Sequence, residues 1–297
     1  MGKPTLLWLH GLSCSGNTQS FLCGEDPHPW DVLSAFELLY HPALTWEEDM
    51  EEVVGRVLKG EVPLDVFVLE GAVGPDNSEV LRELTKRAGY VIALGNCAVF
   101  GNIPALGERA VSGLQFRFKE RGGLLGKDFK SGSGYPVINL SGCPAHPSWL
   151  SHVLMSILED YPIHLDDLGR PKDIYASLTH QGCSRNEYFE WKIDAEGFGK
   201  KEGCLFYYLG CRGPMTHSSC NRILWNGVSS KTRAGMPCVG CTEYDFPREN
   251  LFRTEHLMGV PKDLPEGVSR RGYILLSGVA KTFAPERLKG GTPGESK

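Results

Sequence analysis

The sequence predicts an α/β protein: a flavodoxin-like, doubly wound parallel sheet followed by a smaller, irregular, cysteine-rich domain. Three observations predict this class. Up to about residue 160, short β-rich runs alternate with helical patterns, as expected for a parallel sheet flanked by helices. Beyond about residue 161 the alternation fades into a segment rich in Gly, Pro and Cys. With 41% hydrophobic and 23% charged residues, the chain can bury a core without disulfides.

The strands of the first domain are predicted from short apolar runs bounded by turn residues. They are Thr5–Leu9, Ala35–Tyr40, Val66–Glu70, Tyr90–Leu94 and Val137–Leu140.

Helices are predicted between these strands. Thr45-Trp-Glu-Glu48 has the form of a capping box, which predicts a helix through Val53 and Val57 that ends at Gly60. Ser78–Arg87 and Pro147–Leu158 have the patterns of two further helices.

The remaining chain divides by composition. Six of the ten cysteines lie within the 59 residues from Cys183 to Cys241, and such a segment is organised by metal more readily than by a large core. We therefore expect a first domain over residues 1–160, a second over 161–288 and a flexible tail over 289–297.

The net charge and the start of the sequence predict which partners and which cellular compartment the protein has. The net charge of -5 argues against a nucleic-acid partner. Met1-Gly-Lys-Pro leads straight into the first strand without a secretory signal, which predicts a cytoplasmic chain whose cysteines bind metal or act in catalysis. The apolar stretch Tyr273–Ala280 is far shorter than the roughly 20 residues of a membrane span. We expect any attachment to the cytoplasmic face of a membrane to run through a partner.

Three cysteines of the first domain each follow a predicted strand closely: Cys14, Cys97 and Cys143. In open α/β sheets, ligands bind outside the carboxyl ends of the strands. The three thiols therefore either converge on one site, where nearby glycines let backbone N–H groups approach an inorganic cluster, or are separate buried packing residues.

The second segment has a more specific spacing. It contains His180-Gln-Gly-Cys183, then Cys204, Cys211 and Cys220, and finally Cys238-Val-Gly-Cys241. These residues are enough for two metal sites, and thiolates suit both zinc and iron-sulfur clusters. Two zinc sites remain an alternative on these residues alone.

Five motifs together resemble the small subunit of nickel-iron hydrogenases. They are Gly95-Asn-Cys97-Ala, Gly142-Cys143-Pro, His180-x-x-Cys183, Gly210-Cys211-Arg-Gly-Pro214 and Pro237-Cys-Val-Gly-Cys241-Thr-Glu243. The resemblance spans nearly the whole chain. It implies a proximal cluster on Cys14, Cys97 and Cys143, a distal 4Fe-4S cluster on His180, Cys183, Cys204 and Cys211, and a medial 3Fe-4S cluster on Cys220, Cys238 and Cys241.

The chain departs from the family at its opening motif. The family has Cys-x-Gly-Cys followed by Glu, whereas this chain has Cys14-Ser-Gly-Asn17-Thr-Gln19. The proximal cluster is therefore expected to be either 3Fe-4S, or 4Fe-4S with Asn17, water or another group on the fourth iron. A missing thiolate raises a cluster's reduction potential. Gln19 cannot titrate as the family's Glu does, and Cys23 is expected to pack or lie free.

The resemblance also implies the activity. Hydrogen is split at a nickel-iron centre on a large partner subunit, and this chain carries the electrons through three clusters to a quinone pathway or a carrier protein. The residues of these motifs are similar to those of uptake enzymes without an export signal. We therefore expect a multimer of heterodimers. A hydrogen-sensing complex and a stand-alone ferredoxin-like carrier are the alternatives.

Overall fold

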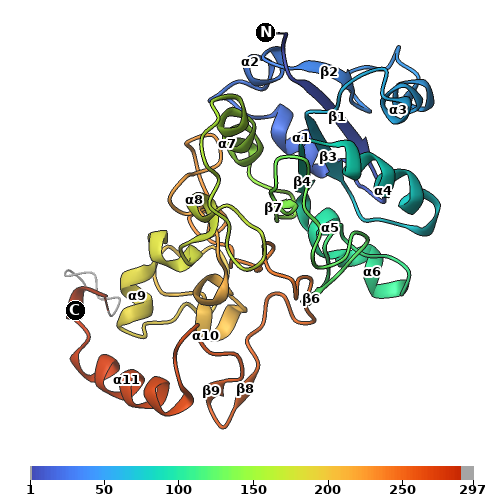
Figure 1. Cartoon of the computed structure of the whole chain (residues 1–297). Helices are drawn as coiled ribbons and strands as arrows, with labels where there is room; N and C mark the ends of the chain where they lie inside the picture. The colour runs from blue at the N-terminus through green and yellow to red at the C-terminus, as the bar shows by residue number, and fades with distance from the viewer. Residues whose placement is uncertain (1, 289–297) are drawn as a thin grey trace. The chain divides into compact units, whose positions relative to one another are not determined.

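The computed structural model describes residues 2–288, and the chain divides into two compact units (Figure 1). The first unit extends to Ala176 and includes the returning segment Cys241–Phe246. The second unit comprises Ser177–Gly240 and the chain from Pro247 onward. The domain limits 1–160 and 161–288 remain predictions about the cluster-binding domains, and the predicted tail 289–297 lies outside the described residues.

A five-stranded parallel sheet forms the centre of the first unit. Its order is β2-β1-β3-β4-β7, the strand order of flavodoxin-like folds. The strands are β1 (Thr5–His10), β2 (Glu37–Tyr40), β3 (Val66–Glu70), β4 (Tyr90–Leu94) and β7 (Ile138–Leu140). Each coincides with a strand predicted from the sequence, and the predicted fold class is confirmed.

The core of this unit lies on the faces of the sheet. Phe67, Leu69 and Val91 are fully buried, and they pack with residues of the covering helices such as Val57 and Leu84. Burial of each such side chain stabilises the fold by roughly 1.5–3 kcal/mol. The carboxyl edge of the sheet is thus held on a rigid base.

Two predicted helices of the first unit form as expected, α4 (Ser78–Arg87) and α7 (Pro147–Leu158). The third, α3 (Met50–Lys59), ends at Gly60 as predicted, but the predicted capping box is wrong. Thr45 Oγ1 donates to the carbonyl of His41 at 3.1 Å within a turn. Asp49 instead caps α3, accepting from the N–H groups of Glu51 and Glu52.

Short elements complete the first unit. They are α1 (Gly16–Leu22), α2 (Pro29–Ser34), η1 (Pro75–Asn77), α5 (Gly95–Phe100), α6 (Asn102–Gly107), β5 (Phe116–Arg117), β6 (Glu120–Arg121) and α8 (Lys172–Tyr175).

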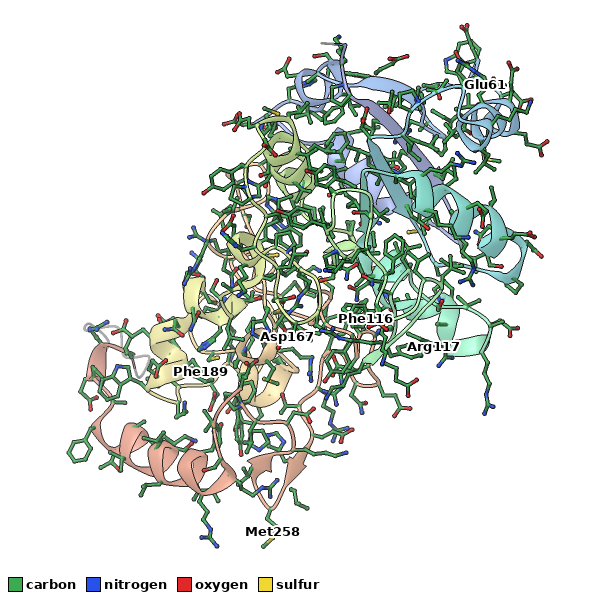
Figure 2. The ribbon with its side chains drawn as sticks, viewed as in Figure 1. Glu61, Phe116, Arg117, Asp167, Phe189 and Met258 are labelled. Carbon is green, nitrogen blue, oxygen red and sulfur yellow. The ribbon has the colours of Figure 1, made fainter. Side chains whose placement is uncertain are left out.

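The second unit is built from short elements around a small core. They are η2 (Thr179–Gly182), α9 (Asn186–Glu190), α10 (Phe206–Leu209), η3 (Gly213–Met215), β8 (His256–Leu257), β9 (Val260–Pro261), α11 (Arg270–Phe283) and η4 (Glu286–Leu288). Phe189 (labelled in Figure 2), Phe206 and Tyr273 belong to a buried cluster that also contains Cys204 and Cys211. The cysteines are therefore part of the core. No helix among residues 2–288 is long and apolar enough to span a bilayer.

Candidate metal centres

The segments that carry Cys14, Cys97 and Cys143, of which the second is the start of α5, are joined to one another at the carboxyl edge of the sheet. The Asn96 N–H donates to the Gly142 carbonyl at 2.9 Å, and the Ala145 N–H donates to Asn17 Oδ1 at 2.9 Å. These bonds connect the loop after β7 with the first turns of α5 and α1. Parallel strands end at the same edge, so the fold places all three segments there.

The thiols of these segments interact. Burial, together with the neighbouring Cys143 and Cys14 thiols, raises the pKa of the Cys97 thiol to about 12. Such coupling requires the three sulfurs to be near one another. A set of clustered, partly buried thiols is a donor set that suits an iron-sulfur cluster.

Glu70 lies buried at the end of β3, below these segments. It accepts hydrogen bonds from the N–H groups of Asn17 and Thr18, both at 3.0 Å, and from Thr18 Oγ1 at 2.6 Å. Burial by itself raises the pKa of Glu70, but hydrogen bonds from His10 and Thr18 outweigh it and lower this pKa to about 2. Glu70 is therefore an anion that caps the first turn of α1.

The Asn17 carboxamide is held on both sides. Its Oδ1 accepts from the Ala145 N–H, and its Nδ2 lies 3.4 Å from Glu70 Oε1. Gly95 has φ of +84°, and a Cβ there would lie 2.3 Å from Asn17 Nδ2. The residue that stands where the family has a fourth cysteine is thus tightly packed and hydrogen-bonded within the protein.

The four residues assigned to the distal site line one cavity of the second unit. This small cavity is bordered by His180, Cys183, Cys204 and Cys211. His180 lies in η2 and Cys183 directly after it, while Cys204 precedes α10 and Cys211 follows it. The ends of η2 and α10 therefore border the same cavity.

Backbone N–H groups point at the sulfurs of this site. The pairs, each at 3.4 Å, are Arg185 N–H to Cys183 Sγ, Phe206 N–H to Cys204 Sγ and Cys238 N–H to Cys211 Sγ. Hydrogen bonds to sulfur favour the thiolate and tune the potential of a cluster bound there.

Burial controls the protonation of the same residues. It raises the pKa of the Cys204 thiol and of the Cys211 thiol to about 12, and it lowers the pKa of His180. A neutral imidazole is the ligand form of histidine, and its Nδ1 is buried without a hydrogen-bond partner among the described residues. Three thiols and an unsatisfied ring nitrogen around one cavity fit an iron-sulfur cluster.

Arg185 supports this site, although it is not predicted from the sequence. Its buried guanidinium donates to the carbonyls of Gly203 at 2.7 Å and Thr232 at 3.2 Å, and also to that of Lys200. It therefore fixes the segment that leads into Cys204. Its position two residues after Cys183 is the only signal, and nothing in that spacing distinguishes it from a surface arginine.

Of the remaining cysteines, Cys238 packs in the same buried cluster as Cys204 and Cys211. Cys220 and Cys238 belong to the second unit and Cys241 to the first, so their grouping as medial ligands stays a prediction. Cys23 is exposed and follows α1. Within residues 2–288, no three His, Cys, Asp or Glu side chains lie close enough to hold a single metal ion.

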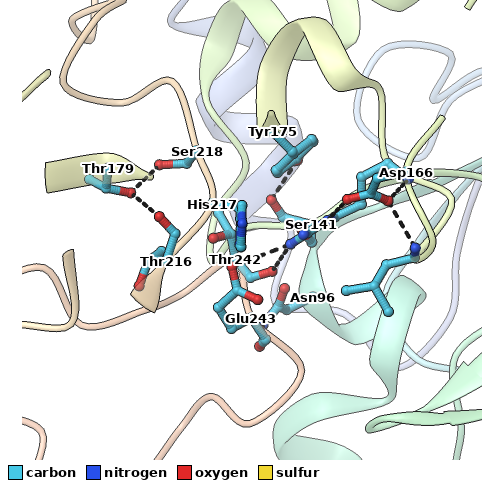
Figure 3. Close-up of polar contacts among 12 residues, drawn as sticks. Asn96, Ser141, Asp166, Tyr175, Thr179, Thr216, His217, Ser218, Thr242 and Glu243 are labelled. Carbon is cyan, nitrogen blue, oxygen red and sulfur yellow. Dashed lines mark hydrogen bonds and ion pairs between the residues drawn. The ribbon is translucent and has the colours of Figure 1, made fainter. Parts of the chain in front are cut away.

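A buried arginine fixes the segment that follows Cys241 to the first unit. Arg170 donates to Asp166 Oδ2 at 2.8 Å, to the Thr242 carbonyl at 3.3 Å and to Glu243 Oε1 at 3.4 Å. Asn96 Nδ2 donates to the Glu243 carbonyl at 3.1 Å (Figure 3). The start of α5, which carries Cys97, and the segment after Cys241 are therefore hydrogen-bonded to each other.

Comparisons with known families match both parts of the chain. Residues 175–253 match the family described as the C-terminal part of the NiFe/NiFeSe hydrogenase small subunit. Residues 14–157 match the family described as NADH ubiquinone oxidoreductase, 20 Kd subunit.

Individual relatives cover most of the chain. This chain is 32% identical over 287 residues to the F420 non-reducing hydrogenase II small subunit of Methanosarcina mazei, and the alignment covers 82% of this chain and 74% of the relative. It is 28% identical to the uptake hydrogenase small subunit of Azotobacter vinelandii, covering 95% and 81%. The actinobacterial-type NiFe-hydrogenase from Ralstonia eutropha H16 superposes with a TM-score of 0.76 at 25% identity, covering 99% and 94%. The chain belongs to the family of nickel-iron hydrogenase small subunits.

Proposed function

We propose that this protein carries electrons from hydrogen through three iron-sulfur clusters, proximal, medial and distal, to an acceptor. As a nickel-iron hydrogenase small subunit, the chain is the electron-transfer part of a hydrogen-oxidising oxidoreductase, and the family implies a large-subunit partner. The observation that carries the proposal is the cavity lined by His180, Cys183, Cys204 and Cys211.

Each cluster has its proposed ligands. His180, Cys183, Cys204 and Cys211 would hold a distal 4Fe-4S cluster, and Cys220, Cys238 and Cys241 a medial 3Fe-4S cluster. Cys14, Cys97 and Cys143 would hold the proximal cluster. The hydrogen bonds of the Asn17 carboxamide with Ala145 and Glu70 support a proximal cluster with three thiolate ligands, since they hold this side chain within the protein.

The clusters, when bound, take up and release one electron at a time. The chain's own residues set how readily they do so. The N–H groups of Arg185, Phe206 and Cys238 stabilise negative charge on the distal sulfurs. A neutral imidazole in place of a fourth thiolate makes the distal site less negative, which favours its reduced state and its position at the exit.

The partners follow from this role. The chain has a single C-x-x-C pair, Cys238–Cys241, which is assigned to the medial cluster, so hydrogen would be split on the large partner. The electron acceptor would be a quinone pathway or a carrier protein. We also propose a multimer of heterodimers of the uptake type, located in the cytoplasm.

The test is anaerobic purification of the native complex, with iron and nickel analysis and EPR spectra in oxidised and reduced states. We expect nickel together with the signals of three clusters. A complex that contains zinc and no iron would show the proposal to be wrong, and a protein that purifies alone with iron and sulfide but no nickel would be a free carrier.

A further inference from the structure

Lys192 follows helix α9 in a backbone conformation that lysine rarely adopts. Its φ is +54°, and its N–H donates to the Phe189 carbonyl at 3.2 Å. The next N–H, that of Ile193, donates to the Tyr188 carbonyl at 3.0 Å. These two bonds form a Schellman motif, in which the left-handed position is usually glycine because a Cβ is unfavourable there. A lysine that is held in this conformation indicates a role for its side chain.

The side chain of Lys192 folds back over the C-terminal end of α9. Its Nζ donates to the Phe189 carbonyl at 2.9 Å and lies 3.9 Å from the centroid of the Phe189 ring. The centroid of the Tyr273 ring lies 5.5 Å from the same Nζ. A cation is attracted both to the carbonyls at a helix C-terminus and to aromatic rings. The positive charge is therefore held in one place, half-buried against the core of the second unit.

Phe189 lies between this ammonium and a proposed distal ligand. Its ring lines the cavity of the distal site, and its centroid is 4.9 Å from that of the His180 imidazole at an interplanar angle of 65°. Burial lowers the pKa of His180, and the charge of Lys192 contributes to this fall. The same charge opposes the rise in the pKa of the Cys204 thiol that burial causes. One fixed positive charge thus acts on two of the four proposed distal ligands.

Two carboxylates act on the same ligands with the opposite sign. Glu190 opposes the fall in the pKa of His180, and Asp194 contributes to the rise in the pKa of Cys204. Both carboxylates also act on the Lys192 ammonium. Lys192 therefore offsets the negative charge of both groups at the distal site. Less negative surroundings raise the reduction potential of an iron-sulfur cluster.

We propose that Lys192 raises the reduction potential of the distal cluster through its fixed positive charge beside His180 and Cys204. The inference rests on the proposed function, since it requires a cluster in the distal cavity, and it deepens that function by adding a residue that binds no iron. The raised potential would draw electrons from the medial cluster toward the exit of the chain.

The test is a redox titration of the purified heterodimeric complex at neutral pH, with the distal cluster followed by EPR. Lys192→Met removes the charge and keeps an apolar side chain, and Lys192→Gly removes it at a position that suits glycine. We expect both variants to lower the distal potential by about 59 mV, which is a roughly tenfold shift of the one-electron equilibrium toward the oxidised cluster. Lys192→Arg keeps the charge, so its potential should remain close to that of the unmodified complex.

Lys262→Met is the matched control, because Lys262 belongs to the same unit but is exposed and pairs with Glu255 at 2.9 Å. Water and salt screen such a charge, so the distal potential should not change. Unchanged potentials in the Met and Gly variants of Lys192 would overturn the inference. So would an equal fall in Lys192→Arg or in Lys262→Met, because the cause would then not be the charge at position 192. An unmodified complex without a distal 4Fe-4S signal would instead overturn the proposed function itself.

Discussion

The Asn17 carboxamide joins three parts of the proximal site: the first turn of α1, Ala145 after β7, and buried Glu70 at the end of β3. A cysteine at this position has no group that accepts and donates in the same directions. Compared with a cysteine, Asn17 therefore changes both the number of thiolates and the bonding between these segments.

Replacement Asn17→Cys should lower the reduction potential of the proximal cluster, because a fourth thiolate adds negative charge at the iron. A redox titration followed by EPR measures it. Asn17→Ala is the control, since it removes the same hydrogen bonds and adds no thiolate. It should leave the potential close to that of the unmodified protein while reducing cluster content. Equal potentials in the Cys variant and the unmodified protein would show that position 17 does not set the potential.

The imidazole of His180 offers a second residue-level prediction. His180→Cys places an anionic thiolate in the distal cavity, so the potential of the distal cluster should fall and electron exit to an artificial acceptor should slow. His217→Asn is the comparison, because His217 belongs to the same unit but pairs with Glu266 at 3.5 Å and does not line the cavity. A distal potential that shifts equally in both variants would contradict ligation by His180.

The sequence predicts which cysteines lie at the same edge of the sheet, but it does not predict the hydrogen bonds of the residues around them. Cys14, Cys97 and Cys143 can be placed at one edge because parallel strands all end there. The bond from the Ala145 N–H to Asn17 cannot be anticipated, since the partners are 128 residues apart and the bond depends on the direction of a single carboxamide. The role of Arg185 cannot be predicted from the sequence either, because it donates to backbone carbonyls, which every residue has.

Among the helices, α3 shows how two glycines act differently within one element. Gly55 lies in the helix interior, where an added Cβ would meet nothing within 4 Å. Gly60 ends the helix with φ of +78°, a conformation that side chains with a Cβ rarely adopt.

Gly55→Ala should therefore stabilise α3 by about 0.5–1 kcal/mol, and Gly60→Ala should destabilise its end by about 1 kcal/mol. Amide hydrogen exchange of the α3 peptides in the intact complex measures both. Exchange should be roughly threefold slower in the first variant and about fivefold faster in the second. Changes of the same sign in the two variants would contradict this account of α3.

Elements are predictable where their pattern is long or fully buried. The five strands are recognised because each is a short apolar run, and α4 and α7 because each has ten or more residues with helical periodicity. Helices such as α1 and α5 have seven and six residues, too few for a period to stand out. The proposed capping box failed because Thr45 bonds within a turn to His41, a local competition that the motif does not show.

At the scale of the whole molecule, the proximal edge of the first unit combines exposed thiol and exposed apolar groups. Cys14 is exposed, and Leu12, Ile103 and Leu106 of the neighbouring segments are large exposed apolar side chains. The Cys97 thiol accepts a hydrogen bond from the Ile103 backbone, so α6 belongs to the same loop cluster. Exposed apolar groups that gather around a functional site indicate an interface, and the family implies a large subunit as the partner.

Ile103→Asp combined with Leu106→Asp should therefore weaken association with the large subunit by at least tenfold, because two carboxylates would have to be desolvated in the interface. The nickel that copurifies with a tagged small subunit should fall in proportion. Tyr161→Asp is the matched control, since Tyr161 and Leu106 are each 60% exposed and Tyr161 follows α7, away from the cysteine-bearing loops. Under the proposed function, electrons would enter this chain where the partner's site approaches the proposed proximal thiols. Full nickel recovery with the double variant, or equal loss with Tyr161→Asp, would place the large subunit on a different face.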